Sequence, residues 1–186
     1  ELTAPWAIDL PPLPGCLMFH IVTAGRGRLE TPGAAPQLLL PGSLTLVPHG
    51  AGHCIRSDAP APAVALFDIP VERISERYEV VRHGGGGEAT QALCGVVRFD
   101  HLAAQRLVAC LPAVLQIDSW SEDDASWLQS TLRFIAREAG ALRPGGETVI
   151  TRLADILVIQ ALRAWLDSAP EAASGWLAAL RNKQIG

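Results

Sequence analysis

The most informative segment of this chain reads Gly42-Ser43-Leu44-Thr45-Leu46-Val47-Pro48-His49-Gly50-Ala51-Gly52-His53. Its apolar run has the length of a β-strand, and Pro48 with Gly50 is typical of a tight turn. A return strand then begins at His53, and we expect the side chain of this histidine to point inward. The segment therefore predicts a strand–turn–strand unit that places a histidine inside a β-sheet fold.

The sequence on both sides of this segment, as far as residue 100, has the same pattern of short strands and turns. Short apolar runs alternate with Gly- and Pro-rich turns, as in many-stranded sandwiches and jelly-roll barrels. The four glycines at 84–87 predict a hairpin tip, because no Lys-Ser/Thr follows them as it would in a phosphate-binding loop. The strands that we expect cover residues 17–22, 37–40, 43–47, 63–67 and 91–99.

From residue 101 onward the apolar residues recur with helical spacing. We expect helices at 102–111, from the cap at Ser121 to about 142, at 149–167 behind a cap at Thr148, and at 176–181. The fold class is therefore α+β, with a β-barrel over residues 1–100 and a helical segment over 101–186.

The helix expected at 149–167 is apolar over a wider arc than one packed face requires. We expect it to contact the barrel on one side and another helix on the other. Two interpretations remain open, a helix buried within its own domain and a helix that forms a dimer interface. In the second case, the interface would involve Leu153, Ile156, Leu157 and Gln160.

The composition limits the class of protein. Apolar residues make up 49% and charged residues 18% of 186 residues, which is typical of an ordered globular chain. The formal net charge of −4 argues against nucleic-acid binding by this segment itself. No apolar run is long enough for a membrane span, and residues 1–4 do not begin a signal peptide, so we expect a cytoplasmic protein. The four cysteines are widely spaced and are expected to be reduced.

Strand alternation brings a small set of polar residues toward the barrel interior. Met18 and His20 share one strand face, and His20 could approach His53 if that face is internal. We expect the ligand pocket to involve Trp6, Met18, His20, His53 and Cys94. His20, His53 and Cys94, with His49 or Cys16 as further candidates, offer nitrogen and sulfur ligands of the kind that zinc accepts. The alternative is that these polar residues line a metal-free pocket or are simply buried. Arg98 shares the strand face of Cys94, which argues against a purely apolar interior at that point.

The segment from Gly42 to His53 resembles the second motif of the cupins, in which the residue at the position of His53 is a metal ligand. The first cupin motif, which supplies two histidines and a glutamate, is degenerate here. Only His20 is present, and Met18 lies about where the glutamate would fall. This departure argues against oxygen-dependent catalysis, so we expect no catalytic residues and no enzyme activity.

Over nearly its whole length the chain resembles the cupin-like sensor domain of AraC-family transcription regulators. This resemblance implies a small-molecule effector in the barrel, a homodimer formed through the long helix, and DNA binding only through helix-turn-helix units absent from this sequence. The alternatives are a stand-alone metal-dependent cupin enzyme and a dimerisation module without a ligand. The segments that carry the resemblance are 19–22, 25–27, 40–53, 78–87, 93–100, 111–115, 152–163, 175–181 and 185–186.

Overall fold

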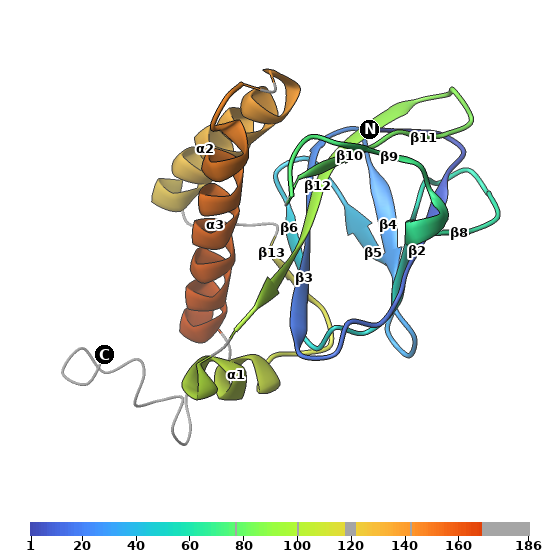
Figure 1. Cartoon of the computed structure of the whole chain (residues 1–186). Helices are drawn as coiled ribbons and strands as arrows, with labels where there is room; N and C mark the ends of the chain where they lie inside the picture. The colour runs from blue at the N-terminus through green and yellow to red at the C-terminus, as the bar shows by residue number, and fades with distance from the viewer. Residues whose placement is uncertain (77, 100, 118–121, 142, 169–186) are drawn as a thin grey trace.

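The computed structural model consists of two β-sheets packed face to face and two long helices that cover the outer face of the larger sheet (Figure 1). This arrangement fits the expected cupin-like barrel. The structure describes residues 1–76, 78–99, 101–117, 122–141 and 143–168.

The larger sheet has six strands, and the smaller sheet has five. In spatial order the larger sheet contains β11 (His83–Gly84), β1 (Leu2–Thr3), β12 (Ala89–Arg98), β3 (Cys16–Ala24), β6 (Leu44–Val47) and β13 (Leu115–Ile117). The smaller sheet contains β5 (Gln37–Leu39), β4 (Gly27–Glu30), β7 (His53–Arg56), β2 (Ala7–Leu10) and β8 (Val64–Ala65). The remaining elements are the 3₁₀ turn η1 (Leu66–Asp68), the hairpin β9 (Val71–Arg73) and β10 (Glu79–Val81), and the helices α1 (Leu102–Ala109), α2 (Glu122–Ala141) and α3 (Gly146–Ser168).

Strand β3 is buried on both faces, which explains why its sequence is a nearly continuous apolar run. Its odd-numbered residues, such as Leu17 and Phe19, belong to the core beneath the helices. Its even-numbered residues Met18 and Val22 belong to the core between the two sheets. His20 lies between these two and therefore points into the barrel.

The turn after β6 depends on Gly50. This residue has a φ of 61°, and an added Cβ atom would lie 2.0 Å from the carbonyl oxygen of Leu13. Only glycine fits such a close approach. The turn brings the chain back as β7, which begins at His53 as the sequence predicts.

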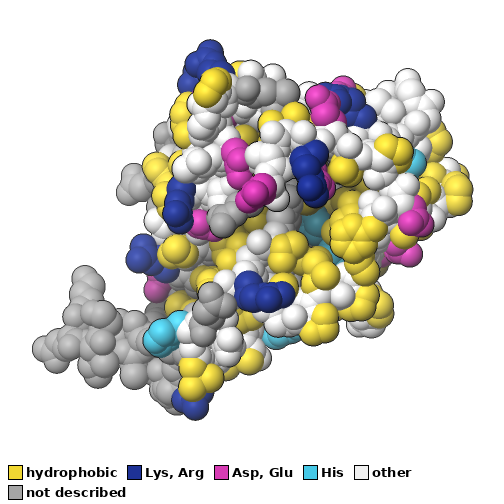
Figure 2. Space-filling model, viewed as in Figure 1, with side chains coloured by type: hydrophobic (Ala, Val, Ile, Leu, Met, Phe, Trp, Pro, Cys, Tyr) yellow, Lys and Arg dark blue, Asp and Glu magenta, His cyan; other side chains and the backbone are white. Residues whose placement is uncertain are grey.

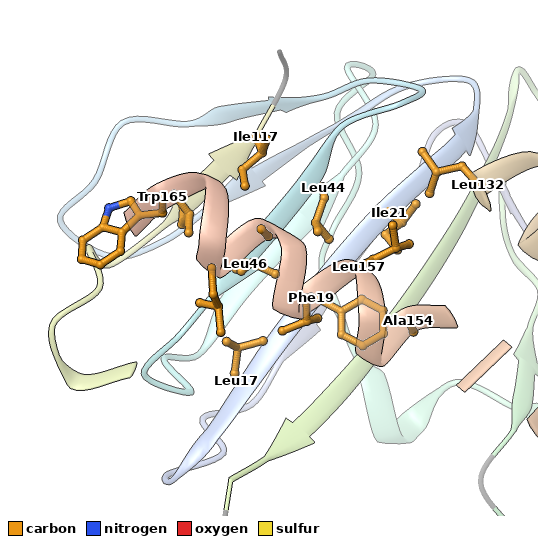
Figure 3. Packing of buried hydrophobic residues seen from close by; sticks show 14 of the residues in the cluster. Leu17, Phe19, Ile21, Leu44, Leu46, Ile117, Leu132, Ala154, Leu157 and Trp165 are labelled. Carbon is orange, nitrogen blue, oxygen red and sulfur yellow. The ribbon is translucent and has the colours of Figure 1, made fainter. Parts of the chain in front are cut away.

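Helix α3 packs on the larger sheet through one of its faces (Figure 3). Leu157 is 0% exposed within the single chain, so it is unable to contact a second chain, and its assignment to a dimer interface is corrected. Leu153 also packs against this core, while Gln160 is half-buried. Ile156 and Ile159 are 41% and 45% exposed on the same helix.

The expected boundary at residue 100 does not divide the packed structure. Strand β13 lies beyond it and pairs with β6 in the larger sheet, so residues 101–186 are not a purely helical segment. The expected helix at 102–111 ends at Ala109, and the expected strand at 63–67 is confined to Val64–Ala65 before η1 begins. The helix expected at 176–181 and the cap at Ser121 lie outside the described residues.

Candidate functional site

Two histidines meet inside the barrel, one from each sheet. His20 on β3 is 1% exposed, and His53 at the start of β7 is 4% exposed. Their Nε2 atoms are 2.7 Å apart, and their rings meet edge to face with centroids 4.9 Å apart. The approach of these two residues, predicted from strand alternation, is confirmed.

A third side chain completes a hydrogen-bonded row. Cys94 lies opposite His20 in the register of β12 and β3, and its Sγ atom is 3.0 Å from His20 Nδ1. At the other end, His53 Nδ1 is 2.9 Å from the carbonyl oxygen of Ala51. We call Cys94, His20 and His53 the relay.

The carbonyl of Ala51 fixes the direction of the hydrogen bonds in the relay. A carbonyl only accepts, so His53 donates from Nδ1, and neutral His53 accepts at Nε2. His20 then donates from Nε2 and accepts at Nδ1, where the Cys94 thiol donates. Every hydrogen bond in the relay is satisfied when all three side chains are neutral.

The electrostatics of the site favour this neutral state. Burial, with a smaller contribution from His53, lowers the pKa of His20 to about 3. Burial also lowers the pKa of His53, although its bond to the Ala51 carbonyl and nearby Asp9 oppose the shift. Burial raises the pKa of the Cys94 thiol to about 12, although its side chain borders a cleft.

The relay does not have the geometry of a zinc site. Two nitrogens on one tetrahedral zinc ion lie roughly 3.3 Å apart, given Zn–N bonds of about 2.0–2.1 Å, so a separation of 2.7 Å is that of a hydrogen bond. Cys94 contacts the opposite nitrogen of His20, so the three donors do not converge. Among the described residues, no group of three His, Cys, Asp or Glu side chains is arranged to hold a metal ion.

The thiol end of the relay opens into a cleft of about 1100 Å³ between the barrel and α3. Its floor includes Met18, His20 and Cys94. Thr151 and Arg152 of α3 line it on the outer side of the larger sheet. Figure 2 shows this hollow between the helical side and the barrel side of the molecule, bordered largely by hydrophobic side chains. His20 and Cys94 face the barrel interior, whereas α3 covers the outer face of the same sheet, so a molecule that extends around the edge of β12 would contact both.

The other expected site residues do not line the cleft. Trp6 is 2% exposed in the core between the sheets and is not part of the cleft lining, so its assignment to the pocket is corrected. His53 lies behind His20 and borders a shallower depression next to the cleft. His49 is exposed and bonds to the carbonyl of Leu111. Cys16 pairs in register with Arg98, four residues beyond Cys94.

Thr45 and the wall from α3 were missed by sequence reasoning. Thr45 lies opposite His20 in the register of β6 and β3, is 0% exposed, and its hydroxyl has no hydrogen-bond partner in the described part of the chain. Its place between Leu44 and Leu46 signals an inward hydroxyl once β6 is recognised as buried on both faces. For Thr151 and Arg152 no local signal exists, because the docking of α3 brings them to the cleft.

A two-sheet barrel with a histidine from the strand–turn–strand unit at its centre defines a cupin-like domain. A cupin family model matches residues 1–167. The chain belongs to the cupin family.

Three curated relatives are transcription regulators by name. The chain is 24% identical over 172 residues to the HTH-type transcriptional regulator AlkR of Acinetobacter baylyi, covering 91% of this chain and 56% of the relative. It is 29% identical over 182 residues to an AraC-like transcription regulator of Streptomyces lividans and 27% identical over 184 residues to one of Streptomyces antibioticus. Each of these two alignments covers 97% of this chain and 58% of the relative. The chain thus spans less than three fifths of the length of these relatives.

No helix in the described part of the chain is long and apolar enough to cross a membrane.

Proposed function

We propose that this chain is the effector-sensing part of an AraC-type transcription regulator. A small molecule occupies the cleft between the barrel and α3, and its binding controls DNA recognition by helix-turn-helix units outside this chain. The observation that carries this proposal is the composition of the cleft, whose walls come from β12 of the barrel and from α3.

Because the barrel and α3 both line the cleft, a bound effector can change the position of α3 relative to the barrel. A ligand shifts a conformational equilibrium only as far as it binds one state better than the other. A molecule that touches both Cys94 on β12 and Thr151 on α3 binds best at one position of the helix against the barrel. Its binding therefore favours one placement of α3 and of the DNA-binding units that follow the sensor in AraC-type proteins.

The charge of the chain supports the proposal that it senses the effector while another part of the protein binds DNA. The formal net charge is −4, whereas DNA-binding surfaces are basic. The DNA-binding surface therefore belongs to the rest of the protein, as the name of the HTH-type relative suggests.

Filling the cleft from its helical wall tests the proposal. In the longer regulator, Thr151→Trp should abolish the response of a promoter reporter to an inducing small molecule. Arg133→Trp is the matched control, because Arg133 is exposed on α2 and belongs neither to the cleft lining nor to α3. An undiminished response of Thr151→Trp would exclude the cleft as the effector site.

We also propose that a second copy of the chain packs on the exposed side of α3, where Ile156 and Ile159 lie next to half-buried Gln160. The same helix then carries both the effector wall and the dimer contact. This assignment replaces the one that included Leu157.

The two alternative functions have less support. A ligand-free dimerisation module does not need an open cleft with a thiol and an imidazole on its floor. A metal-dependent enzyme needs converging metal ligands, which the relay does not provide. Zinc binding stays a prediction, and elemental analysis of the purified chain tests it: about one zinc per chain, lost in His53→Ala, would establish the metal.

A further inference from the structure

We propose that the cleft binds a short basic peptide in an extended conformation, which adds to the larger sheet along an unpaired edge of β12. The inference rests on the proposed function in one respect, because it names the chemical class of an effector for the same cleft. Strand addition to the purified chain is measured without the rest of the regulator, so the two proposals are tested separately.

Strand β12 has an edge without a partner strand. On one side, residues 91–98 of β12 pair with β3. On the other side, β1 pairs only with Ala89 and Thr90. No other strand pairs with β12 in the part of the chain that the structure describes. Alternate residues of a strand direct their N–H and C=O groups to opposite sides, so this edge carries backbone groups that a further strand can bind.

The hairpin of β9 and β10 limits the length of this edge. Val81 packs against the core between the sheets, whereas Tyr78 packs against the core beneath the helices. The chain between these two residues therefore passes around the edge of the larger sheet. Farther along β12, the side chains of Cys94, Val96 and Arg98 are exposed. We call residues 94–98 of β12 the free edge.

The free edge lies inside the cleft. All residues from 92 to 98 line the cleft, so the strand is accessible from both faces of the sheet. On the barrel side, Phe67 and Val71 of the lining are 76% and 44% exposed. On the other side, Thr148 and Thr151 of α3 line the cleft, and Figure 1 shows β12 running between α3 and the barrel. An added strand would therefore lie in a groove and not on an open surface.

The two sides of this groove favour different side chains. Successive residues of an extended peptide point to opposite faces, so one set meets the apolar barrel side and the other meets α3. On α3, Glu147 and Asp155 both line the cleft. They are eight residues apart, about 12 Å along a helix, and four residues of a strand span about 13 Å. A peptide with basic and apolar residues in alternation therefore fits both sides.

The charge of the lining favours a basic peptide over a second copy of the chain. Even with Glu79 and Asp155 counted as paired to arginines, the remaining carboxylates outnumber Arg98. The relay adds no positive charge, because burial lowers the pKa of His20 to about 3. Two copies paired edge to edge would bring two acidic linings together, whereas a basic peptide is attracted. The charged residues of the lining are Glu1, Glu76, Glu79, Glu147, Asp155, Arg98 and Arg152.

The known binding mode of strand addition relies on main-chain hydrogen bonds for affinity and on alternate side chains for specificity. The free edge has few of the features that protect sheet edges in natural proteins. It contains no proline and no lysine, and its single charged residue is Arg98 at the end. An edge of this kind inside a groove is suited to pairing with a peptide that the groove selects.

The first test titrates the purified chain with acetyl-Lys-Val-Lys-Val-Lys-Val-amide in a calorimeter. Two isomers are the matched controls, one with methyl groups on the three valine nitrogens and one with them on the three lysine nitrogens. Each isomer loses the N–H groups of one edge of the peptide and keeps every side chain. We expect one peptide to bind per chain, and only one isomer to bind at least about tenfold more weakly, because two or three hydrogen bonds are lost. No binding of the parent peptide, or equal affinities of the two isomers, would overturn strand addition.

Hydrogen exchange locates the bound peptide. Exchange of the backbone amides at the free edge should slow when the parent peptide is present. Strand β5 is the matched control, because it is an edge strand of the smaller sheet and pairs only with β4 within the described residues. Protection of β5 as strong as that of the free edge would show unspecific association and reject the assignment.

Charge reversal tests the basic character of the peptide. Glu147→Lys should weaken binding of the parent peptide about fivefold, since one exposed ion pair is replaced by repulsion. Glu88→Lys should change it less than about twofold, because Glu88 is exposed but does not line the cleft. Thermal unfolding checks that both variants are folded. Equal effects of the two variants would contradict the assignment of a basic peptide.

The outcomes separate this inference from the proposed function. If Thr151→Trp abolishes the reporter response but the parent peptide does not bind the purified chain, the inference is rejected and the proposed function stands. If the peptide binds with the expected difference between isomers but Thr151→Trp leaves the response intact, strand addition stands and the cleft is not the effector site.

Discussion

The buried imidazole of His20 makes the stability of the fold depend on pH. Its pKa is lowered to about 3 by burial, whereas an unfolded chain returns it to about 6.5. The unfolded state therefore binds a proton more readily, and folding becomes weaker as the pH falls. The contribution of neutral His20 to stability is therefore complete above pH 6.5 and is lost as the pH falls from there toward 3.

Replacing the titrating group should flatten this dependence. When the pH falls from 7.5 to 5, protonation of His20 in the unfolded state should lower the unfolding free energy of the wild type by about 2 kcal/mol. His20→Gln lacks this group and should not show this loss. Urea unfolding of both proteins at the two pH values measures the difference, in which the other titrating groups largely cancel. Parallel losses in the two proteins would contradict the assignment of His20 as a buried neutral residue.

At the scale of single residues, the sequence predicts what lies close in the local pattern. Alternation in β3 and the turn before His53 predict that His20 and His53 meet. Cys94, which the sequence offers as a pocket residue, contacts His20 Nδ1, but this contact depends on the register of β12 against β3, which alternation does not fix. Trp6 was wrongly included in the pocket, because no local signal tells a buried aromatic residue in the core from one that lines a cleft.

At the scale of an element, the turn between β6 and β7 places His53. Gly50 combines a positive φ of 61° with an approach of 2.0 Å between its added Cβ and the Leu13 carbonyl. Gly33 has a φ of 78° and no atom within 4 Å of an added Cβ, so it carries the backbone preference without the collision. Comparing substitutions at the two glycines therefore distinguishes the cost of a positive φ from the cost of a steric clash with Leu13.

We expect Gly50→Ala to destabilise the fold by about 3 kcal/mol or more and Gly33→Ala by only about 1 kcal/mol. The larger loss arises because Leu13 and the turn must both move to admit the methyl group. Thermal unfolding followed by circular dichroism measures both variants. Equal losses would show that the loop around Leu13 adapts and that the turn does not depend on this contact.

Long helices were easier to predict than short strands or the contacts that each element makes. The helical period predicts α2 and α3 within a few residues. Strand β13 has only three residues, too few for a period, and it gains its place by pairing with β6. The apolar arc of α3 predicts two contact faces, but it does not tell which face the barrel takes, so Leu157 was placed on the wrong one.

For the whole molecule, α3 is the element through which sensing and assembly are joined in our proposal. One part of it forms the cleft wall at Thr151 and Arg152, and Leu157 anchors it on the sheet. Ile156 and Ile159 remain exposed, and burying an isoleucine contributes about 1.5–3 kcal/mol. A movement of the helix against the barrel would therefore also move the surface that meets the second copy.

Charges on this surface should separate the two copies without unfolding either. The double variant Ile156→Asp/Ile159→Asp should weaken the dimer by roughly a hundredfold or more, since about 3 kcal/mol or more of apolar burial is lost. Size-exclusion chromatography with light scattering over a range of protein concentrations measures the change, and thermal unfolding checks the fold. The matched control is Leu38→Asp/Leu40→Asp, in which Leu38 of β5 and Leu40 directly after this strand are 43% and 42% exposed in the smaller sheet, away from the helices. A wild-type chain that is monomeric at every concentration, or a dimer that survives the helix variant but not the control, would place the assembly surface elsewhere and separate it from the effector cleft.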